Sequence, residues 1–310
     1  MFDLSPAHAM PRTAATDPQN APRALPQSAE FARALRAVGQ SPLVLDRMQD
    51  MVVLRRKWFG RLPMAMINRA DLKKPARMLE ILQEEGLRRT PVILSPERPT
   101  PDLGRLGALP LMTPASIARL DLSGTSQDRR ARLRQKWRNR LNAAEAAPLR
   151  VTRQNMPIEN DHWLLRADTA QQKQRLYSSW PHSLTLAYAQ ENPGAAKLFQ
   201  AFEGRDVVAA ILVLTHGDSA TYHISHSLVR GRKLGAHNLL MWSAMEWLAA
   251  KGITSLDLGV VNTEDASNLA RFKLGTGADV QRLGGTWLFW PPLSRRIAPL
   301  ARLDLASMGA

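Results

Sequence analysis

The amino-acid sequence predicts a mixed α/β fold that combines antiparallel and parallel strand pairs. Three observations lead to this prediction. In the last third of the 310-residue chain, three strand-like segments precede alternating helical and strand-like segments, which is the order of a meander joined to helical crossovers. The composition, with 45% hydrophobic and 22% charged residues, is that of a globular protein. No run of 18 apolar residues occurs, so we expect no transmembrane segment.

The elements of the last third follow from apolar alternation, helical spacing and glycine-containing turns. A glycine after a helical pattern marks the end of the helix, as Gly252 and Gly275 do here. The predicted elements in this part are strands at 198–203, 207–215 and 220–227, a helix at 234–250, a strand at 254–258, a helix from 262 or 263 to 275, and one strand at 280–289 that closes the sheet.

The preceding part of the chain has shorter apolar runs, separated by basic residues and turns. Five prolines predict that 96–122 is mostly irregular. The elements predicted around it are a helix at 28–38, strands at 43–45, 51–54 and 63–67, a helix at 72–85, a strand at 91–95, a helix at 125–147, a strand at 149–152, and a helix at 159–178.

The length of the chain favours two domains, because about 150 residues is typical of one. The first 30 residues are rich in Pro, Ala, Ser and Gln and show no apolar periodicity, which is typical of disorder. We therefore predict a flexible tail over 1–28, an N-terminal module over 29–147 that ends in a basic linker helix, a C-terminal module over 148–293, and a basic tail over 294–310.

Forty-two Lys and Arg residues against 27 Asp and Glu give the chain a net charge of +15. Such an excess favours anionic partners, namely RNA, DNA, an anionic membrane surface or a phosphate-bearing cofactor. The absence of cysteine excludes disulfides, thiolate metal sites and a cysteine nucleophile. The first residues lack the apolar core of a secretory signal, so we expect a cytoplasmic protein or, alternatively, a membrane-peripheral one.

The most basic segment is Arg129–Arg140, which contains seven cations and no acid. Leu133, Trp137 and Leu141 recur every four residues and would form one apolar stripe of a helix. Like charges at i,i+4 destabilise a helix by about 0.2–0.5 kcal/mol per pair, a cost that an anionic partner would relieve. Two interpretations stay open, a solvated helix face and a polyanion-binding face. The residues of the polyanion-binding face would be Arg130, Arg134, Lys136 and Arg138.

A second basic segment joins the predicted strand at 220–227 to the predicted helix at 234–250. Its two glycines allow a ligand to approach the main chain closely, and the first N–H groups of a helix can bind a phosphate or pyrophosphate. The alternative is a tight basic turn without a ligand. The candidate cofactor-binding residues are Arg230, Gly231, Arg232, Lys233, Gly235 and Ala236.

Two charged residues near the end of the chain are candidates for catalysis. Asp257 lies between Leu256 and Leu258 on a predicted strand and therefore faces away from both leucines. Lys273 lies on the short helix that ends at Gly275. Each could orient a substrate or stabilise charge. The alternative for each is an ordinary ion pair or a surface group.

Two further candidates lie on the predicted strand at 220–227. Strand alternation places His223 on one face and Tyr222, Ile224 and His226 on the other. Tyr222 or His223 could relay a proton, and the alternative is a structural hydrogen bond. His223 and His226 do not share a face, and the chain has no HExxH spacing, so we predict no metal site.

These segments, in their order and spacing, resemble the GNAT acyltransferase superfamily, and within it the FemABX or FemAB-like branch. The resemblance extends over about 197–290, from the predicted hairpin through the basic glycine loop to the last strand. The segments that carry it are Leu256–Gly259 (Leu-Asp-Leu-Gly), Ala270–Gly275 with its Phe-Lys pair, and Lys136–Leu141 followed by Ala144-Glu145.

This resemblance implies tandem GNAT-like modules with a cleft between them, the C-terminal module being complete. It implies transfer of an acyl or aminoacyl group to an amine. The donor is acyl-coenzyme A or, in the branch that builds peptidoglycan bridges, aminoacyl-tRNA. In that branch the lysine of the Phe-Lys pair contacts substrate or stabilises negative charge, a role that falls on Lys273. The usual pyrophosphate loop, Arg/Gln-x-x-Gly-x-Gly/Ala, is matched at Arg232 and Gly235, and the sequence departs from it at His237.

We therefore expect a GNAT-type N-acyltransferase in which an amine attacks the acyl-coenzyme A carbonyl directly, without a metal or a covalent enzyme intermediate. Lys273 and Asp257 would orient substrate or stabilise the oxyanion, and the strand around Tyr222 and His223 would line the acyl carbonyl site. One alternative is an aminoacyl-tRNA-dependent transferase of cell-envelope synthesis. A second alternative is a non-enzymatic polyanion-binding protein on a GNAT scaffold.

Overall fold

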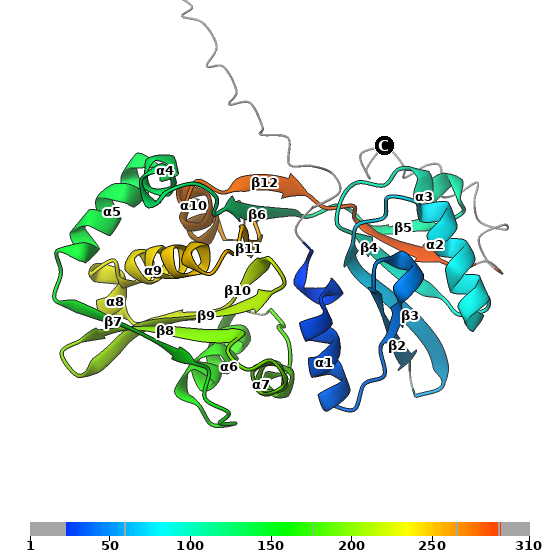
Figure 1. Cartoon of the computed structure of the whole chain (residues 1–310), viewed down its shortest axis with the longest axis horizontal. Helices are drawn as coiled ribbons and strands as arrows, with labels where there is room; N and C mark the ends of the chain where they lie inside the picture. The colour runs from blue at the N-terminus through cyan, green and yellow to red at the C-terminus, as the bar shows by residue number, and fades with distance from the viewer. Residues whose placement is uncertain (1–22, 59, 176, 265, 291, 293–310) are drawn as a thin grey trace, which may run out of the picture.

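The computed structural model describes residues 23–58, 60–175, 177–264, 266–290 and 292. In this part of the chain the strands form two sheets, and α1 lies at their junction (Figure 1). Each sheet contains parallel and antiparallel pairs, which confirms the predicted mixed α/β class. In chain order the helices are α1 (Ala29–Ala37), α2 (Pro75–Leu82), α3 (Asp102–Arg105), α4 (Ser126–Arg132), α5 (Gln135–Glu145), α6 (Trp163–Arg175), α7 (His182–Glu191), α8 (Val229–Lys233), α9 (Ala236–Ala250) and α10 (Ser267–Gly275).

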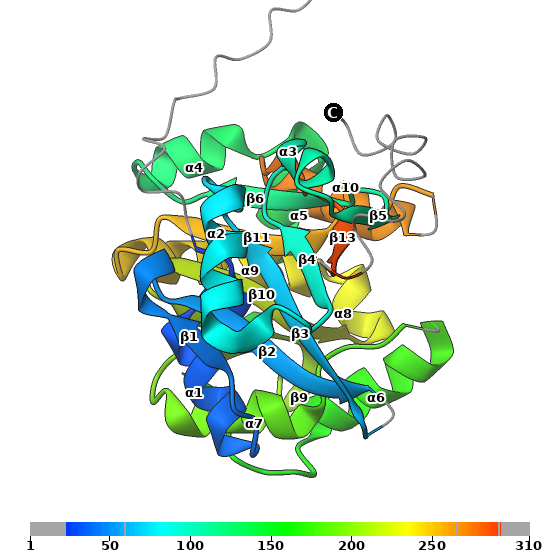
Figure 2. The ribbon, with the colours of Figure 1, turned by 90° about the vertical axis from the view of Figure 1, so that its right-hand side faces the viewer.

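The first sheet has six strands. Its strands, in spatial order, are β1 (Leu43–Leu45), β2 (Met51–Trp58), β3 (Leu62–Ala70), β4 (Val92–Pro96), β13 (Thr286–Phe289) and β5 (Leu109–Met112). β3 and β4 are parallel, and α2 connects them and lies in front of the strands in Figure 2. Met78 and Ile81 of α2 share a buried core with Val92 and Leu94 of β4. This core belongs to the first sheet alone.

The second sheet has seven strands. Its strands, in spatial order, are β12 (Asp279–Arg282), β6 (Ser116–Asp121), β11 (Ser255–Val260), β10 (Ser219–Ser227), β9 (Asp206–His216), β8 (Ala196–Glu203) and β7 (Leu149–Asn155). The run from β7 to β10 is antiparallel, as predicted for the hairpins, whereas β10 and β11 are parallel and α9 connects them. The meander and the crossover expected from the sequence are therefore present.

Helices cover both faces of the second sheet. Leu141 of α5 and Leu240 of α9 belong to the core on one face. The core on the other face includes residues of α6 and α7, together with Phe31 of α1 and Val52 of β2. Residues from the beginning of the described chain thus pack against the second sheet. Among the described residues, no helix has the length and the apolar surface needed to cross a bilayer.

Each sheet contains one strand from the other part of the chain. β6 lies between β11 and β12 in the second sheet, and β13 lies between β4 and β5 in the first. The predicted single strand over 280–289 is therefore wrong. The chain leaves the second sheet at Gly284, where a Cβ would clash with the carbonyl oxygen of Arg98, and enters the first sheet at Thr286. The second sheet is completed by β6 and not by the last strand of the C-terminal segment.

The prediction that 96–122 is mostly irregular is also wrong, because this range contains α3, β5 and β6. Pro110 lies in β5, an edge strand, where a missing N–H is tolerated. Pro114 precedes β6 and does not interrupt it. A domain boundary near 148 stays a prediction. Each side of that position contributes one strand to the sheet formed mainly by the other side.

Three further predictions need correction. Residues 23–28 are not a flexible tail, because the Gln27 side chain is buried and accepts the N–H of Val52 at 2.9 Å. The remainder of both predicted tails, 1–22 and 293–310, lies outside the described residues. The predicted helix at 159–178 is the shorter α6. Helix α7 follows it and is not predicted from the sequence, because the buried residues of α7 are nearly consecutive in sequence and do not form one helical stripe. The loop predicted before α9 contains α8.

Candidate active site

β10 and β11 are hydrogen-bonded neighbours over only a short stretch. Their parallel register ends where Thr221 is opposite Asp257. Beyond this pair, β10 has a bulge between Tyr222 and Ile224, and the register of β11 against β6 shifts between Asp257 and Val260. Bulges bend a strand and interrupt its ladder. The two strands therefore separate beyond Thr221 and Asp257, at the centre of the second sheet.

The bulge decides which face each side chain of β10 occupies. Tyr222 packs against the core beneath α9, whereas Ile224 belongs to the core beneath α6 and α7. His223 also lies on the α7 side, with Nε2 2.9 Å from Oγ1 of Thr185. The predicted alternation, which places Tyr222 and Ile224 on one face, is therefore wrong. The extra residue of the bulge shifts the alternation by one position.

Four aromatic rings connect β10 to α9, α10 and α5. The Tyr222 hydroxyl lies 2.6 Å from Nε2 of His237. The His237 ring is 4.9 Å from the ring of Phe272, which is 6.0 Å from the ring of Trp137. Burial lowers the pKa of His237 to about 4, so its imidazole is neutral at pH 7. His237, at which the sequence departs from the family loop, thus packs against Tyr222 of β10 and Phe272 of α10.

Lys273 lies where β11 ends. Its side chain projects from α10, is only 6% exposed, and donates a hydrogen bond from Nζ to the carbonyl oxygen of Val260 at 2.8 Å. Burial lowers its pKa to about 8, and the negative charge of Asp257 partly opposes that shift. A buried amine with this pKa can donate a proton, or stabilise a developing negative charge, near neutral pH. The structure thus places Lys273 beside the point where the two strands separate.

Asp257 is as buried as Lys273, but both of its carboxylate oxygens are already bound. Oδ2 accepts from Nη1 of Arg69 at 2.6 Å, and Oδ1 accepts the N–H of Gly259 at 2.7 Å. Gly259 has φ +77, a left-handed conformation, and lies where the register of β11 shifts. The bond from its N–H to Asp257 holds it in that conformation. The carboxylate is therefore a structural anchor of the strand end.

Arg69 and its partners connect the two sheets. Glu97, which follows β4, accepts from Nε and Nη2 of Arg69 at 2.8 and 3.0 Å. Glu97 also pairs with Arg119 of β6 and accepts from Gln281 of β12 at 3.2 Å. This network is not predicted from the sequence. Its only local signal is a charged residue, Arg119, within a short strand whose neighbours Ile117 and Leu120 are buried.

A second polar cluster lies between α6, α7 and the β10 bulge. Asp168 is buried and accepts from Nε2 of Gln172 at 2.6 Å, while Nε2 of His182 lies 3.0 Å away. The His223 ring is 4.8 Å from the ring of Trp180, and burial lowers its pKa to about 4. His223 is thus neutral and lies on the face opposite to Tyr222. Asp168 and His182 had no sequence signal, because neither lies in a recognisable spacing.

The basic glycine segment forms α8 and the start of α9. Gly235 is the N-cap of α9 and has φ +68, and a Cβ at Gly231 would clash with a backbone oxygen of β9. Arg230 is paired with Glu203, whereas Arg232 donates to the Ser227 carbonyl at 2.7 Å. Lys233 is exposed, and Ala236, the first residue of α9, is buried. The glycines are therefore required by close packing and by a left-handed turn, whether or not a ligand binds.

The basic segment before 145 is not one helix. It is divided at Leu133 and Arg134 into α4 and α5, and the N–H of Arg134 bonds the Gly275 carbonyl at 2.9 Å. The apolar stripe predicted at Leu133, Trp137 and Leu141 is buried as expected. The residues predicted to form one polyanion-binding face, Arg130, Arg134, Lys136 and Arg138, lie on both sides of this break and so do not share one helix.

The cations of this segment have separate environments. Arg129 is buried and pairs with Glu246 at 2.9 Å. Arg130 pairs with Glu145 at 2.6 Å. Arg138 is half-buried and donates to the Leu133 carbonyl at 3.3 Å, while Arg134 and Lys136 are exposed. Part of this positive charge is therefore already neutralised within the protein.

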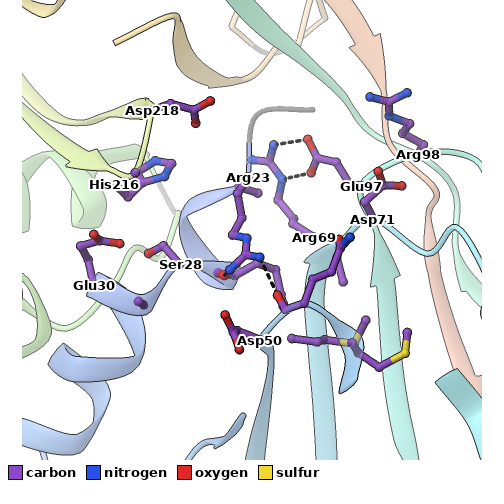
Figure 3. A pocket seen from close by; sticks show the side chains of 18 of the residues that line it. Arg23, Ser28, Glu30, Asp50, Arg69, Asp71, Glu97, Arg98, His216 and Asp218 are labelled. Atoms are coloured by element: carbon purple, nitrogen blue, oxygen red, sulfur yellow. Dashed lines mark hydrogen bonds and ion pairs between the residues drawn. The ribbon is translucent and has the colours of Figure 1, made fainter. Parts of the chain in front are cut away.

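A cavity of about 570 Å³ lies between the two sheets. Asp218, His216 and Glu30 lie on one side of it, and Arg69 and Glu97 lie on the other (Figure 3). The lining has both signs of charge, and burial lowers the pKa of His216 to about 4. Among the described residues, no group of three or more His, Asp or Glu side chains is arranged to hold a metal ion.

Comparison with known proteins identifies this arrangement. Residues 127–274 match the family model of the acetyltransferase (GNAT) domain. Among solved structures, the chain is similar to FemX, with a TM-score of 0.70, 12% identity, and coverage of 91% of this chain and 94% of that chain. No sequence of a curated protein matches.

Two further solved structures are similar to the chain. One is the C-terminal domain (DUF2156) of a putative lysylphosphatidylglycerol synthetase from Agrobacterium fabrum, with a TM-score of 0.54, 14% identity, and coverage of 90% of this chain and 92% of that chain. The other is L-PGS from Bacillus licheniformis, with a TM-score of 0.53, 12% identity, and coverage of 92% and 98%. At these identities the likeness concerns the fold.

The matched family segment contains α5, β10, α9 and β11, which together form the candidate site, and it ends within α10. Residues 127–274 therefore form a GNAT domain of the N-acyltransferase class. Its two sheets together form the tandem GNAT-like architecture that is also seen in FemX, as the FemAB-like resemblance implies.

Proposed function

We propose that the protein transfers an acyl group from a phosphate-bearing donor of the acyl-coenzyme A type to an amine acceptor. The observation that carries this proposal is the separation of β10 and β11 beyond Thr221 and Asp257, with Nζ of Lys273 at its edge. A bulged strand leaves peptide groups outside the regular ladder. In β10 the extra residue is His223, and we propose that its peptide groups bind the carbonyl oxygen of the donor.

Lys273 is the residue proposed to act on the reacting atoms. One N–H of its ammonium group binds the Val260 carbonyl, which leaves two donors for a ligand. When the acceptor amine attacks the donor carbonyl, negative charge develops on the carbonyl oxygen and then on the leaving thiolate. An ammonium group with a pKa of about 8 can stabilise the first charge and protonate the second, and the neutral amine that this leaves can take up the proton released by the acceptor nitrogen.

The donor phosphates are proposed to bind at the start of α9. This helix has 15 residues, and its N-cap residue, Gly235, provides no side-chain cap. Arg140 approaches this end of α9, where its Nη2 donates to the Arg232 carbonyl at 2.5 Å, and Lys233 is exposed nearby in sequence. Cations beside the positive end of a helix dipole are unfavourable in isolation, and an anionic ligand would relieve that cost.

The test is turnover of acetyl-coenzyme A with a mixture of primary amines. Turnover is measured as release of the free thiol. Lys273→Ala should lower kcat by at least about 10²-fold, the scale for losing one electrostatic contact to a transition state. Lys251→Ala removes an exposed lysine at the far end of α9 and should leave the rate unchanged. Wild-type turnover in a folded Lys273→Ala protein would reject the assignment.

Aminoacyl-tRNA is the alternative donor, in a transferase of cell-envelope synthesis. Two observations favour it: the fold shared with FemX over 91% of the chain, and the packing of α5 on α9 and α10, where Trp137 lies against Phe272. An elongated donor would pass over the start of α5, where Arg134 and Lys136 are exposed, since Trp137 itself is buried. Filter binding of bulk tRNA tests it, since affinity should fall steeply with salt. No retention at low salt would reject this donor.

The third candidate is a non-enzymatic protein that binds a polyanion, such as RNA or an anionic membrane surface. The exposed side chains of Arg134 and Lys136 support it, whereas the ion pair of Arg130 with Glu145 does not. This candidate requires binding to tRNA or to vesicles of anionic lipid without thiol release from any acyl donor. Co-purified coenzyme A species, detected by mass spectrometry, would favour the enzyme.

A further inference from the structure

Arg69 is held in a conformation that ordinary residues avoid. It has φ +57, and the register of β3 against β4 shifts between Asn68 and Ala70, so Arg69 is the extra residue of a bulge. A left-handed conformation is unfavourable for a residue with a side chain. Such strain persists only where the surroundings over-determine the position. Here the contacts of the Arg69 guanidinium group hold the residue in this conformation.

Glu97 fixes the orientation of the guanidinium group. It accepts from Nε and Nη2 of Arg69 at 2.8 and 3.0 Å, which is a bidentate pair. Glu97 is only 5% exposed and is itself held by Arg119 of β6 and by Gln281 of β12. The plane of the Arg69 fork is therefore set by partners from both sheets.

The remaining nitrogen of the fork reaches the candidate site. Nη1 of Arg69 donates to Oδ2 of Asp257 at 2.6 Å, and Oδ1 of Asp257 accepts the N–H of Gly259 at 2.7 Å. The next residue, Val260, accepts from Nζ of Lys273 at 2.8 Å. A continuous series of short contacts thus runs from β3 in the first sheet to α10 in the second.

We propose that Arg69 is a positioning residue for the transfer site: acting through Asp257, it fixes the end of β11 and thereby the place of Lys273. This inference rests on the proposed function, in which Lys273 acts in transfer. Three of the five N–H groups of Arg69 bind Glu97 and Asp257, so we assign it a role through Asp257 and not a contact with the reacting atoms. In this arrangement the first sheet sets the geometry of the reaction that occurs in the second.

The decisive variant is the double change Arg69→Met with Glu97→Gln. It removes the positive fork together with its main counter-charge, so that no additional net charge is buried between the sheets. Arg69→Lys is the second variant, in case the double variant does not fold. A lysine keeps the charge but cannot make the three contacts of the fork. Arg77→Met is the matched control, because Arg77 is an exposed arginine of α2, the helix that packs on the same sheet, and pairs with Glu80 of that helix.

The first measurement does not depend on activity. In the full chain, labelled on lysine and glycine and free of ligands, NMR follows the titration of Lys273 and the amide signal of Gly259. Lys273→Arg and Gly259→Ala variants assign these two signals. We expect the Gly259 amide signal and the pKa of Lys273 both to move in the double variant, the pKa by about half a unit or more. Arg69→Lys should move them less, and Arg77→Met should not move them.

Asp257→Asn shows in which direction the charge of Asp257 shifts the pKa of Lys273. It removes the negative charge that favours the ammonium form, so the pKa of Lys273 should fall below that of the wild type. A Gly259 signal and a Lys273 titration that stay at their wild-type positions in both folded Arg69 variants would overturn the proposal. Arg69 would then be an ion pair between the sheets without influence on Lys273.

The second measurement is turnover with acetyl-coenzyme A and the amine mixture. The folded Arg69 variants should lose about 10- to 100-fold in kcat, with little change in the KM of the donor, because misplacing a reacting group affects the chemical step. Absence of turnover in the wild type, with the NMR shifts present, would reject the proposed function and leave the positional link standing. Normal kcat in variants that show the NMR shifts would reject a role in transfer.

Discussion

Replacing Lys273 with Met should change how the free energy of unfolding depends on pH. In the folded protein, burial lowers the pKa of Lys273 to about 8, compared with 10.5 for a free lysine. Since one pKa unit corresponds to about 1.4 kcal/mol, this difference corresponds to about 3 kcal/mol. Between pH 8 and 10.5 the unfolded chain holds this proton and the folded chain does not. The wild-type protein therefore gains stability from this group as the pH rises through that window.

The assay is urea unfolding, followed by tryptophan fluorescence, at a series of pH values from 7 to 10.5 for the wild type and Lys273→Met. Groups that titrate in both proteins cancel in the difference. The wild type should gain about 3 kcal/mol relative to the variant across the window, with no change below pH 8. Lys251→Met, which removes an exposed lysine, should show no such trend. A difference between wild type and Lys273→Met that is constant with pH would refute the depressed pKa.

Three further outcomes follow from individual contacts. Gly275→Ala should lower the free energy of unfolding by about 1–3 kcal/mol in urea titrations, because the new Cβ would lie 2.5 Å from the Trp137 ring; an unchanged midpoint would contradict this packing. Ser28→Ala removes the cap of α1 and should cost about 1 kcal/mol in the same measurement, and a neutral effect would show that the cap is not needed. Arg232→Glu should raise the KM for acetyl-coenzyme A about tenfold in thiol-release assays, whereas Lys251→Glu at the other end of α9 should not; equal effects would argue against phosphate binding at the start of α9.

The parts of the fold that the sequence predicts are those specified by neighbouring residues. The strands from β8 to β10 and helix α9 follow from local alternation, helical spacing and turn glycines, and each has its predicted counterpart. The positions of β6 and β13 depend on partners far away in the chain. In the strand ladders Arg119 is opposite Asp257, and Trp287 is opposite Leu94. No local pattern contains such pairings.

The candidate site divides in the same way. Lys273 and Asp257 stand out in the sequence because a short motif contains each of them. The contact that holds Asp257 could not be predicted, because its partner Arg69 lies in a strand of the other sheet. The face of Tyr222 depends on a bulge at His223, and a bulge adds one residue without a sequence signature of its own.

The exchange of β6 and β13 makes the two halves inseparable as folding units. A fragment that begins at 148 lacks β6, so β11 and β12 lose the strand that joins them. A fragment that ends at 147 lacks β13 and leaves β4 and β5 unpaired with each other. During synthesis, neither sheet can be completed from its own half of the chain: the first waits for residues 286–289, which are made after the last strand of the second sheet. Pairings of such long sequence separation form slowly and leave strand edges exposed meanwhile, so folding of this enzyme is in essence a single late event.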